Sequence, residues 1–133
     1  KLLAEGNFAW VDAEYDEFND NVAGVAVSRA GNSPSNVPDK VANLWLTYDV
    51  APRWQLGMDT RYVASVYADA ANTLSVPSYT LFGAFVGYEL AEDTQLSLRG
   101  RNLTDEVYAR QAGSTMLYLG APRSLEVALQ TRF

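Results

Sequence analysis

The sequence contains neither cysteine nor histidine. The lack of cysteine excludes a disulfide framework and thiolate chemistry, and the lack of histidine removes the commonest acid–base group and the commonest metal ligand. No nucleophile–base pair can be assembled without them, and neither a nucleotide-binding loop nor a zinc spacing is visible. We therefore predict a protein that is not an enzyme and has no catalytic residue, no cofactor and no metal site.

Basic residues are also scarce. Lys and Arg number 10 against 16 Asp and Glu, which gives a net charge of −6. Nucleic acids are bound chiefly through positive charge, so no nucleic-acid partner is expected. The densest acidic cluster has carboxylates suited to a hard cation, but it lacks the glycine-centred loop of a calcium motif, and we interpret it as a solvated strand end and loop. Its members are Asp12, Glu14, Asp16, Glu17 and Asp20.

Long apolar runs are missing as well. The longest stretch without a charge, residues 70–88, is broken by Asn72, Ser75 and Pro77, so no transmembrane helix is predicted. No signal peptide is visible at the start, because Leu2 and Leu3 are followed by Glu5 rather than by an apolar core. Residues 2–15 already have the pattern of a strand, and we expect the chain to be a C-terminal part of something longer.

What is present is a repeated two-residue period. In the last ten residues apolar and polar side chains alternate, which predicts a strand with one apolar and one polar face. The first set is Leu125, Val127, Leu129, Thr131 and Phe133, and the second is Ser124, Glu126, Ala128, Gln130 and Arg132. Similar patterns predict strands over residues 2–15, 41–50, 54–67, 79–90, 94–102 and 123–133.

The predicted connections alternate in length. Residues 51–53 and 91–93 form tight turns, whereas residues 16–40, 68–78 and about 103–122 form long loops. This alternation is typical of a membrane barrel with extended external loops and short periplasmic turns. The predicted fold is all-β, an antiparallel up-and-down meander of about six strands.

Four aromatic residues lie on the apolar parity of their strands, at the ends nearest a short turn or the C-terminus. An aromatic girdle at one membrane interface has this arrangement, because amphipathic rings prefer the interface. We expect membrane-interface and assembly roles for Tyr48, Trp54, Tyr88 and Phe133.

The C-terminal part also resembles a known family. Asn102-Leu103-Thr104-Asp105-Glu106-Val107-Tyr108, then Gly120-Ala121-Pro122-Arg123 and a terminal aromatic strand, resemble the end of TonB-dependent outer-membrane receptors, with Thr104 in place of the usual aromatic. The resemblance implies a 22-stranded transmembrane β-barrel with an N-terminal plug. Residues 1–133 would then be the C-terminal segment of that barrel, and the plug domain and earlier strands would lie upstream.

The same resemblance implies function and partners. The protein would take part in active uptake of a scarce nutrient across the cell outer membrane of a Gram-negative bacterium, with a ferric siderophore as the leading substrate and vitamin B12 or glycans as others. Its partners would be outer-membrane lipid, the plug domain and remaining barrel strands of the same protein, the TonB–ExbB–ExbD complex through the N-terminal part, and the barrel-assembly machinery through the C-terminal strand.

Candidate ligand-binding residues lie in the last long loop, because exposed loops on a rigid scaffold carry recognition. They are Arg110, Gln111, Ser114, Thr115 and Tyr118. Charged residues on the polar parity could contact a plug or an anionic ligand, but we expect them chiefly to pair across strands. They are Asp59, Arg61, Arg99, Arg101, Glu126 and Arg132.

The alternative is a soluble β-sheet ligand-binding module. In such a module the apolar faces would be buried in a core, whereas in a membrane barrel they lie outside.

Overall fold

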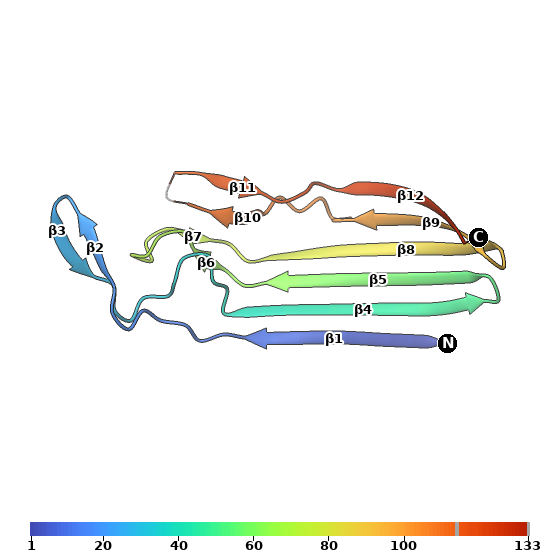
Figure 1. Cartoon of the computed structure of the whole chain (residues 1–133), viewed down its shortest axis with the longest axis horizontal. Helices are drawn as coiled ribbons and strands as arrows, with labels where there is room; N and C mark the ends of the chain where they lie inside the picture. Colours follow the sequence, from blue (N-terminus) through green and yellow to red (C-terminus); the bar gives the residue numbers. More distant parts are fainter. Residues whose placement is uncertain (114, 133) are drawn as a thin grey trace.

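The computed structural model describes residues 1–113 and 115–132, and its main element is a six-stranded antiparallel sheet (Figure 1). The strands lie in the order β1-β4-β5-β8-β9-β12. Their bounds are Leu2–Trp10, Lys40–Ala51, Trp54–Val63, Tyr79–Ala91, Thr94–Arg101 and Ser124–Thr131. This order is the predicted up-and-down meander, so the all-β fold and its six main strands are confirmed.

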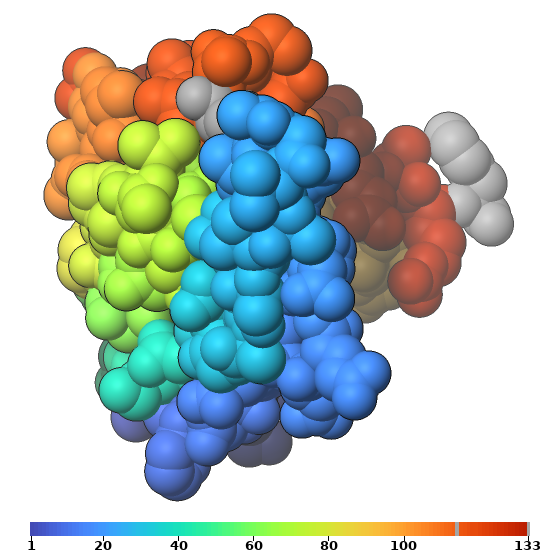
Figure 2. Space-filling view, turned by 90° about the vertical axis from the view of Figure 1, so that its left-hand side faces the viewer, coloured from blue at the N-terminus to red at the C-terminus, as the bar shows by residue number. Residues whose placement is uncertain are grey.

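The connections separate the two ends of the sheet. Two-residue turns join β4 to β5 and β8 to β9 at the end that lies to the right in Figure 1, which we call the turn end. The long connections all lie at the opposite end, which we call the loop end. Seen from the loop end in Figure 2, the chain follows an arc, from blue β1 at the bottom through green and yellow on the left to red β12 on the right.

The long connections are not irregular loops throughout, as the sequence had suggested. Each contains a short two-stranded hairpin at the loop end. The hairpins are β2 (Asn19–Val22) with β3 (Val25–Ser28), β6 (Val66–Tyr67) with β7 (Ser75–Val76), and β10 (Ala109–Ala112) with β11 (Leu117–Leu119).

Two predicted strands are also too long. The first ends at Trp10 instead of residue 15, because Trp10 pairs with Lys40, the first residue of β4. Beyond this pair the Val11 N–H still donates to the carbonyl oxygen of Asp39 at 2.9 Å, but the regular ladder has ended. The strand predicted over residues 54–67 ends at Val63, and its last two residues form β6 and pair with β7.

The turn of the β2–β3 hairpin explains why this element was missed. Ala23 and Gly24 form its two-residue turn, with φ of 52° and 86°. Positive φ at both positions is the geometry that matches the twist of a hairpin. Alanine at the first position is not a usual signal for this turn, so the sequence pattern there resembles a loop.

The sheet has two different faces and no second layer. Directly paired residues share a face, and the register brings Leu46 beside Met58 and Val86 beside Leu98 on one side. The buried apolar residues of the described part lie near the loop end and number only Val63, Ala64, Val76 and Ala112. A soluble module would bury its apolar face in a two-layer core, so this alternative does not fit.

Within residues 1–113 and 115–132 there is no helix of the length and hydropathy that crossing a bilayer requires.

Candidate functional site: a cavity at the loop end

The outer face of the sheet consists of apolar side chains that remain exposed. Leu56 and Leu98 are 43% and 44% exposed, and Val127 on β12 is 71% exposed. The alternating residues of β12 face the other way, where Glu126 accepts a hydrogen bond from Arg101 on β9 at 3.3 Å. The predicted parity of the faces is therefore confirmed on these strands.

The opposite face, which we call the inner face, holds the charged residues expected to pair across strands. Arg101 and Glu126 form the one such ion pair among the described residues of this set, at 3.3 Å. Arg61 donates instead to the side-chain oxygen of Asn43 at 3.2 Å, and the guanidinium carbon of Arg99 lies 5.2 Å from the ring centroid of Phe85. Cross-strand pairing is thus found for Arg61, Arg99, Arg101 and Glu126, through hydrogen bonds, a cation–π contact and an ion pair. For Asp59 and Arg132 it stays a prediction.

Of the four aromatic residues predicted at one membrane interface, two are in contact at the turn end. Trp54 and Tyr88 are direct partners on β5 and β8, and their ring centroids are 4.6 Å apart. Tyr48 lies on the same face, opposite Leu56, and is 49% exposed. Phe133 lies outside the described residues. The interface role of these residues stays a prediction.

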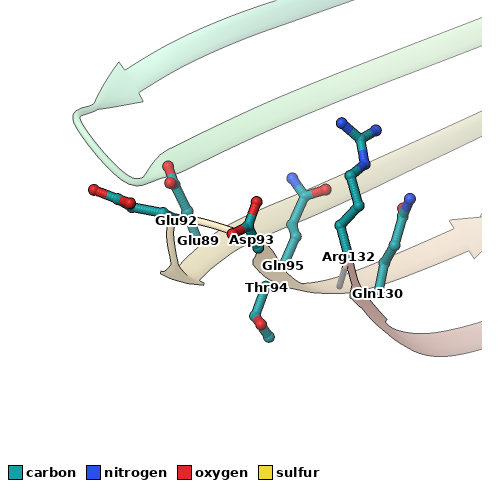
Figure 3. Close-up of a pocket in the computed structure, with 7 residues that line it drawn as sticks. All are labelled: Glu89, Glu92, Asp93, Thr94, Gln95, Gln130 and Arg132. Carbon is teal, nitrogen blue, oxygen red and sulfur yellow. The ribbon is translucent and has the colours of Figure 1, made fainter.

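A depression at the turn end is lined by acidic and amide side chains (Figure 3). Its volume is about 250 Å³, and Arg132 is the one basic side chain on its wall. Its walls come from the β8–β9 turn and the end of β12, and it is open to solvent. The described residues contain no group of three or more carboxylates placed to hold a metal ion, here or in the acidic cluster of residues 12–20.

The loop end contains a second cavity, of about 200 Å³. It lies between the loop-end residues of β4, β5 and β8 and the β6–β7 and β10–β11 hairpins. Arg110 and Gln111 of β10 line it, together with Arg61 of the inner face. Its remaining wall is largely apolar, with Val63, Val66, Val76, Tyr79 and Ala112. Two arginines and the amides of Gln111 and Asn36, on a wall that is otherwise largely apolar, suit a compact anionic or oxygen-rich ligand.

The other predicted ligand residues lie elsewhere. Tyr118 pairs with Gln111 in the β10–β11 hairpin and is 49% exposed, but it does not line the cavity. Thr115 is exposed at the tip of the hairpin, also away from the cavity. Ser114 lies outside the described residues. Arg61 was not predicted as a cavity residue, because only the tertiary structure places the end of β5 and β10 on the wall of one cavity.

The polar side chains of residues 102–108 have a structural role at the loop end. Asn102 is 6% exposed, and its side chain donates to the carbonyl oxygens of Glu106 and Ala121 at 2.9 and 3.1 Å. The carboxylate of Asp105 accepts the backbone N–H of Arg123 at 3.1 Å. These bonds join the end of β9 to the start of β12, as expected for Asn and Asp that stabilise turns.

One carboxylate at the loop end has a shifted pKa. The backbone N–H of Leu74 donates to Asp69 at 2.8 Å and lowers the pKa of this carboxyl below its ordinary value. Thr73 adds a bond from its hydroxyl at 2.8 Å and one from its backbone N–H at 3.0 Å. Bonds to the charged form favour ionisation, so Asp69 holds the β6–β7 loop as a carboxylate.

Residues 2–103 match the family described as TonB dependent receptor-like, beta-barrel. The chain is 40% identical over 82 residues to the probable TonB-dependent siderophore receptor PiuA of Acinetobacter baumannii, covering 62% of this chain and 11% of that protein. It is 31% identical over 137 residues to the ferrichrome outer membrane transporter/phage receptor of Escherichia coli K12, covering 96% and 17%.

A solved structure has the same fold. The crystal structure of the siderophore receptor PiuA from Acinetobacter baumannii superposes with a TM-score of 0.90 at 29% identity, over 98% of this chain and 19% of that chain. The chain thus spans less than a fifth of each of these relatives.

Proposed function

We propose, because this chain belongs to the TonB-dependent receptor-like β-barrel family, that it forms part of the wall of an outer-membrane receptor that imports a ferric siderophore. The observation that carries this proposal is the two-faced sheet. Its outer face exposes Leu56, Leu98 and Val127 without a covering layer, while its inner face carries charged and polar side chains. A wall between lipid and a polar lumen requires this division.

The orientation of the wall follows from its two ends. Trp54 and Tyr88 lie at the turn end, where short turns face the periplasm in this class of barrel. The loop end would then lie outside the cell, and the cavity lined by Arg61, Arg110 and Gln111 would open toward the incoming ligand. Outer-membrane localisation is a property of the family.

The proposed place of the chain is the C-terminal segment of a 22-stranded barrel. The plug domain and the other strands would come from the same protein, and β1 and β12 would each pair with a strand outside this segment. Two unpaired strand edges in lipid are too costly, which supports this arrangement. Energy would be supplied by the TonB–ExbB–ExbD complex through the N-terminal part of the receptor, and insertion would depend on the barrel-assembly machinery.

The substrate is proposed from the printed names of the relatives. These include a siderophore receptor, a ferrichrome transporter and a ferrioxamine receptor of Yersinia enterocolitica. Ferric siderophore complexes present many oxygen atoms and often carry negative charge, and two guanidinium groups at the cavity suit such a surface. Within the last long loop, we propose that Arg110 and Gln111 contact ligand, with Ser114, Thr115 and Tyr118 as outer contacts.

The test is iron uptake by the full-length receptor. A deletion strain complemented with the receptor should take up radiolabelled iron from a ferric siderophore, and the uptake should vanish when TonB is absent or the proton gradient is collapsed. Arg110→Ala with Arg61→Ala should lower the affinity for the ferric complex, whereas Arg53→Ala at the turn end should leave it unchanged. Uptake of vitamin B12 in place of iron would contradict the proposed substrate. Transport without TonB would contradict the proposed mechanism.

A further inference from the structure

A short segment between β3 and β4, residues 32–36, contacts two hairpins that are remote in sequence. The side chain of Asn36 donates from Nδ2 to the carbonyl oxygen of Ala112 at 2.8 Å. Its Oδ1 accepts the backbone N–H of the same residue at 2.8 Å. The two residues are 76 positions apart, so one side-chain amide pairs with one residue of β10 as a neighbouring strand would.

Asn72, in the connection between β6 and β7, makes the same reciprocal pair with Ser33. Its Oδ1 accepts the N–H of Ser33 at 2.8 Å, and its Nδ2 donates to the carbonyl oxygen at 2.9 Å. Two further bonds join the same elements. The backbone N–H of Asn36 donates to Tyr67 at 2.8 Å, and the side chain of Asn32 donates to the carbonyl oxygen of Ala70 at 2.8 Å.

Asn36 and Asn72, the two asparagines that form these reciprocal pairs, both have a left-handed backbone. The φ angles of Asn36 and Asn72 are 60° and 57°, a region that asparagine tolerates better than other residues with side chains. An alanine there would lose the amide and add backbone strain, whereas a glycine would lose the amide without that strain. Glycine substitutions therefore isolate the contribution of the side-chain bonds.

The Asn36 bond also satisfies a buried group. Ala112 is 3% exposed, so its N–H and carbonyl groups are removed from water and need partners within the protein. Asn36 and Ala112 line the loop-end cavity together, beside Arg110 and Gln111. Figure 2 looks onto this end, where the light-blue to cyan, yellow-green and orange segments meet.

We propose that Asn36 and Asn72 are positioning residues that lock the β3–β4 segment and the β6–β7 and β10–β11 hairpins into one body, so that Asn36 fixes Arg110 and Gln111 at the cavity. The lock itself is independent of any ligand. Its effect on ligand binding rests on the proposed function. The loop-end hairpins then move together, and the cavity keeps its shape without a bound ligand.

Hydrogen exchange of the full-length receptor, held in lipid nanodiscs without ligand, tests the lock. Asn36→Gly removes both side-chain bonds to Ala112 and should speed exchange of the segment that contains Ala112 by roughly tenfold or more, because the N–H of Ala112 loses its acceptor. Asn72→Gly should do the same at Ser33. Asn21→Gly is the matched control, because Asn21 accepts only the N–H of Gly24 at 2.8 Å within its own hairpin. Exchange in β8 and β9 should stay unchanged and shows that each variant is folded.

The position of β10 is measured separately, by the distance between spin labels at Arg110 and at Gln95 near the turn end. The wild type should give one narrow distance distribution, and Asn36→Gly should broaden it, while Asn21→Gly should not. Faster dissociation of a ferric trihydroxamate, severalfold in Asn36→Gly, is the expected consequence for ligand.

The outcomes separate the lock from the function. Unchanged exchange at Ala112 and an unchanged distance distribution in Asn36→Gly would overturn the lock. A changed distribution with an unchanged dissociation rate would overturn its role in ligand binding. Failure of every variant and of the wild type to bind any ferric chelate would overturn the proposed function, while the exchange and distance data would still establish the lock.

Discussion

The aromatic ring of Phe85 lies directly over Gly57, its partner on the neighbouring strand. A side chain at position 57 would collide with the ring. Arg99, on the neighbouring strand β9, contacts the same ring through its guanidinium group. Two residues further along the same strands, the Asp59 carboxylate lies over Gly83. The inner face of β5 and β8 is thus built from pairs of one large and one missing side chain.

Gly57→Ala should therefore destabilise the barrel by about 1–3 kcal/mol, the usual cost of overpacking. Chemical unfolding of the full-length receptor in lipid measures this change. Gly87→Ala is the control, since an added Cβ there meets only the end of the flexible Gln95 side chain, at 2.9 Å. Phe85→Leu should restore part of the loss in the double variant. Equal losses in Gly57→Ala and Gly87→Ala would contradict the role of the ring.

A charge on the outer face should prevent stable insertion. Leu98 lies between Val86 and Val127 on that face, so Leu98→Arg should cost about 2–4 kcal/mol near the middle of the bilayer. Ser97→Arg, one residue away on the inner face, should cost much less. The amount of folded receptor in the outer membrane reports the difference, and similar losses in both variants would contradict the assignment of faces.

The loop that contains Asp69 should loosen in acid. Hydrogen bonds from Leu74 and Thr73 lower the pKa of this carboxyl below its ordinary 3.8. A carboxyl with a depressed folded pKa contributes stability that is present above about pH 3.8 and lost as the pH falls through the lower folded value. Exchange of the Leu74 amide, corrected for its intrinsic pH dependence, should accelerate in that window. In Asp69→Asn the acceleration should disappear, and its persistence would assign it to another group.

Deletion of Phe133 tests the role of the C-terminus in assembly. An alternating terminal strand offers an edge for β-augmentation by the assembly machinery, so loss of Phe133 should lower the amount of receptor in the outer membrane. The ligand affinity of the inserted fraction should stay nearly unchanged, because the proposed ligand site lies at the loop end. Normal surface abundance with weakened binding would place the C-terminus in the ligand site instead.

The main strands could be predicted because their side chains obey a two-residue period set by one apolar and one polar face. Leu125, Val127 and Leu129 alternate with Glu126 and Gln130, and no other regular structure has this period. Turn positions followed from Pro52 and from the acidic pair at residues 92 and 93. Strand ends were less certain, because the ladder stops where the partner stops, as for Trp10 opposite Lys40.

The loop end could not be predicted in the same way. The strands of its hairpins are two to four residues long, which is too short for an alternating period to be recognised. The asparagine bridges join residues as far apart as Asn36 and Ala112, and a pattern along the chain does not reveal such a contact. Arg61 could not be predicted as a cavity residue for the same reason, since β5 and β10 line one cavity only in the folded chain.

The central claim is that this sheet is a wall between lipid and a polar lumen. Single cysteines can be introduced along β12 at positions 125 to 130 of a full-length receptor in which any other cysteine has been replaced, and labelled with nitroxides. This chain itself contains no cysteine that would compete for the label. We predict that labels at Leu125, Val127 and Leu129 relax with molecular oxygen, which partitions into lipid. Labels at Glu126, Ala128 and Gln130 should relax with a water-soluble nickel chelate. Equal accessibility of both sets to the nickel chelate would contradict the account.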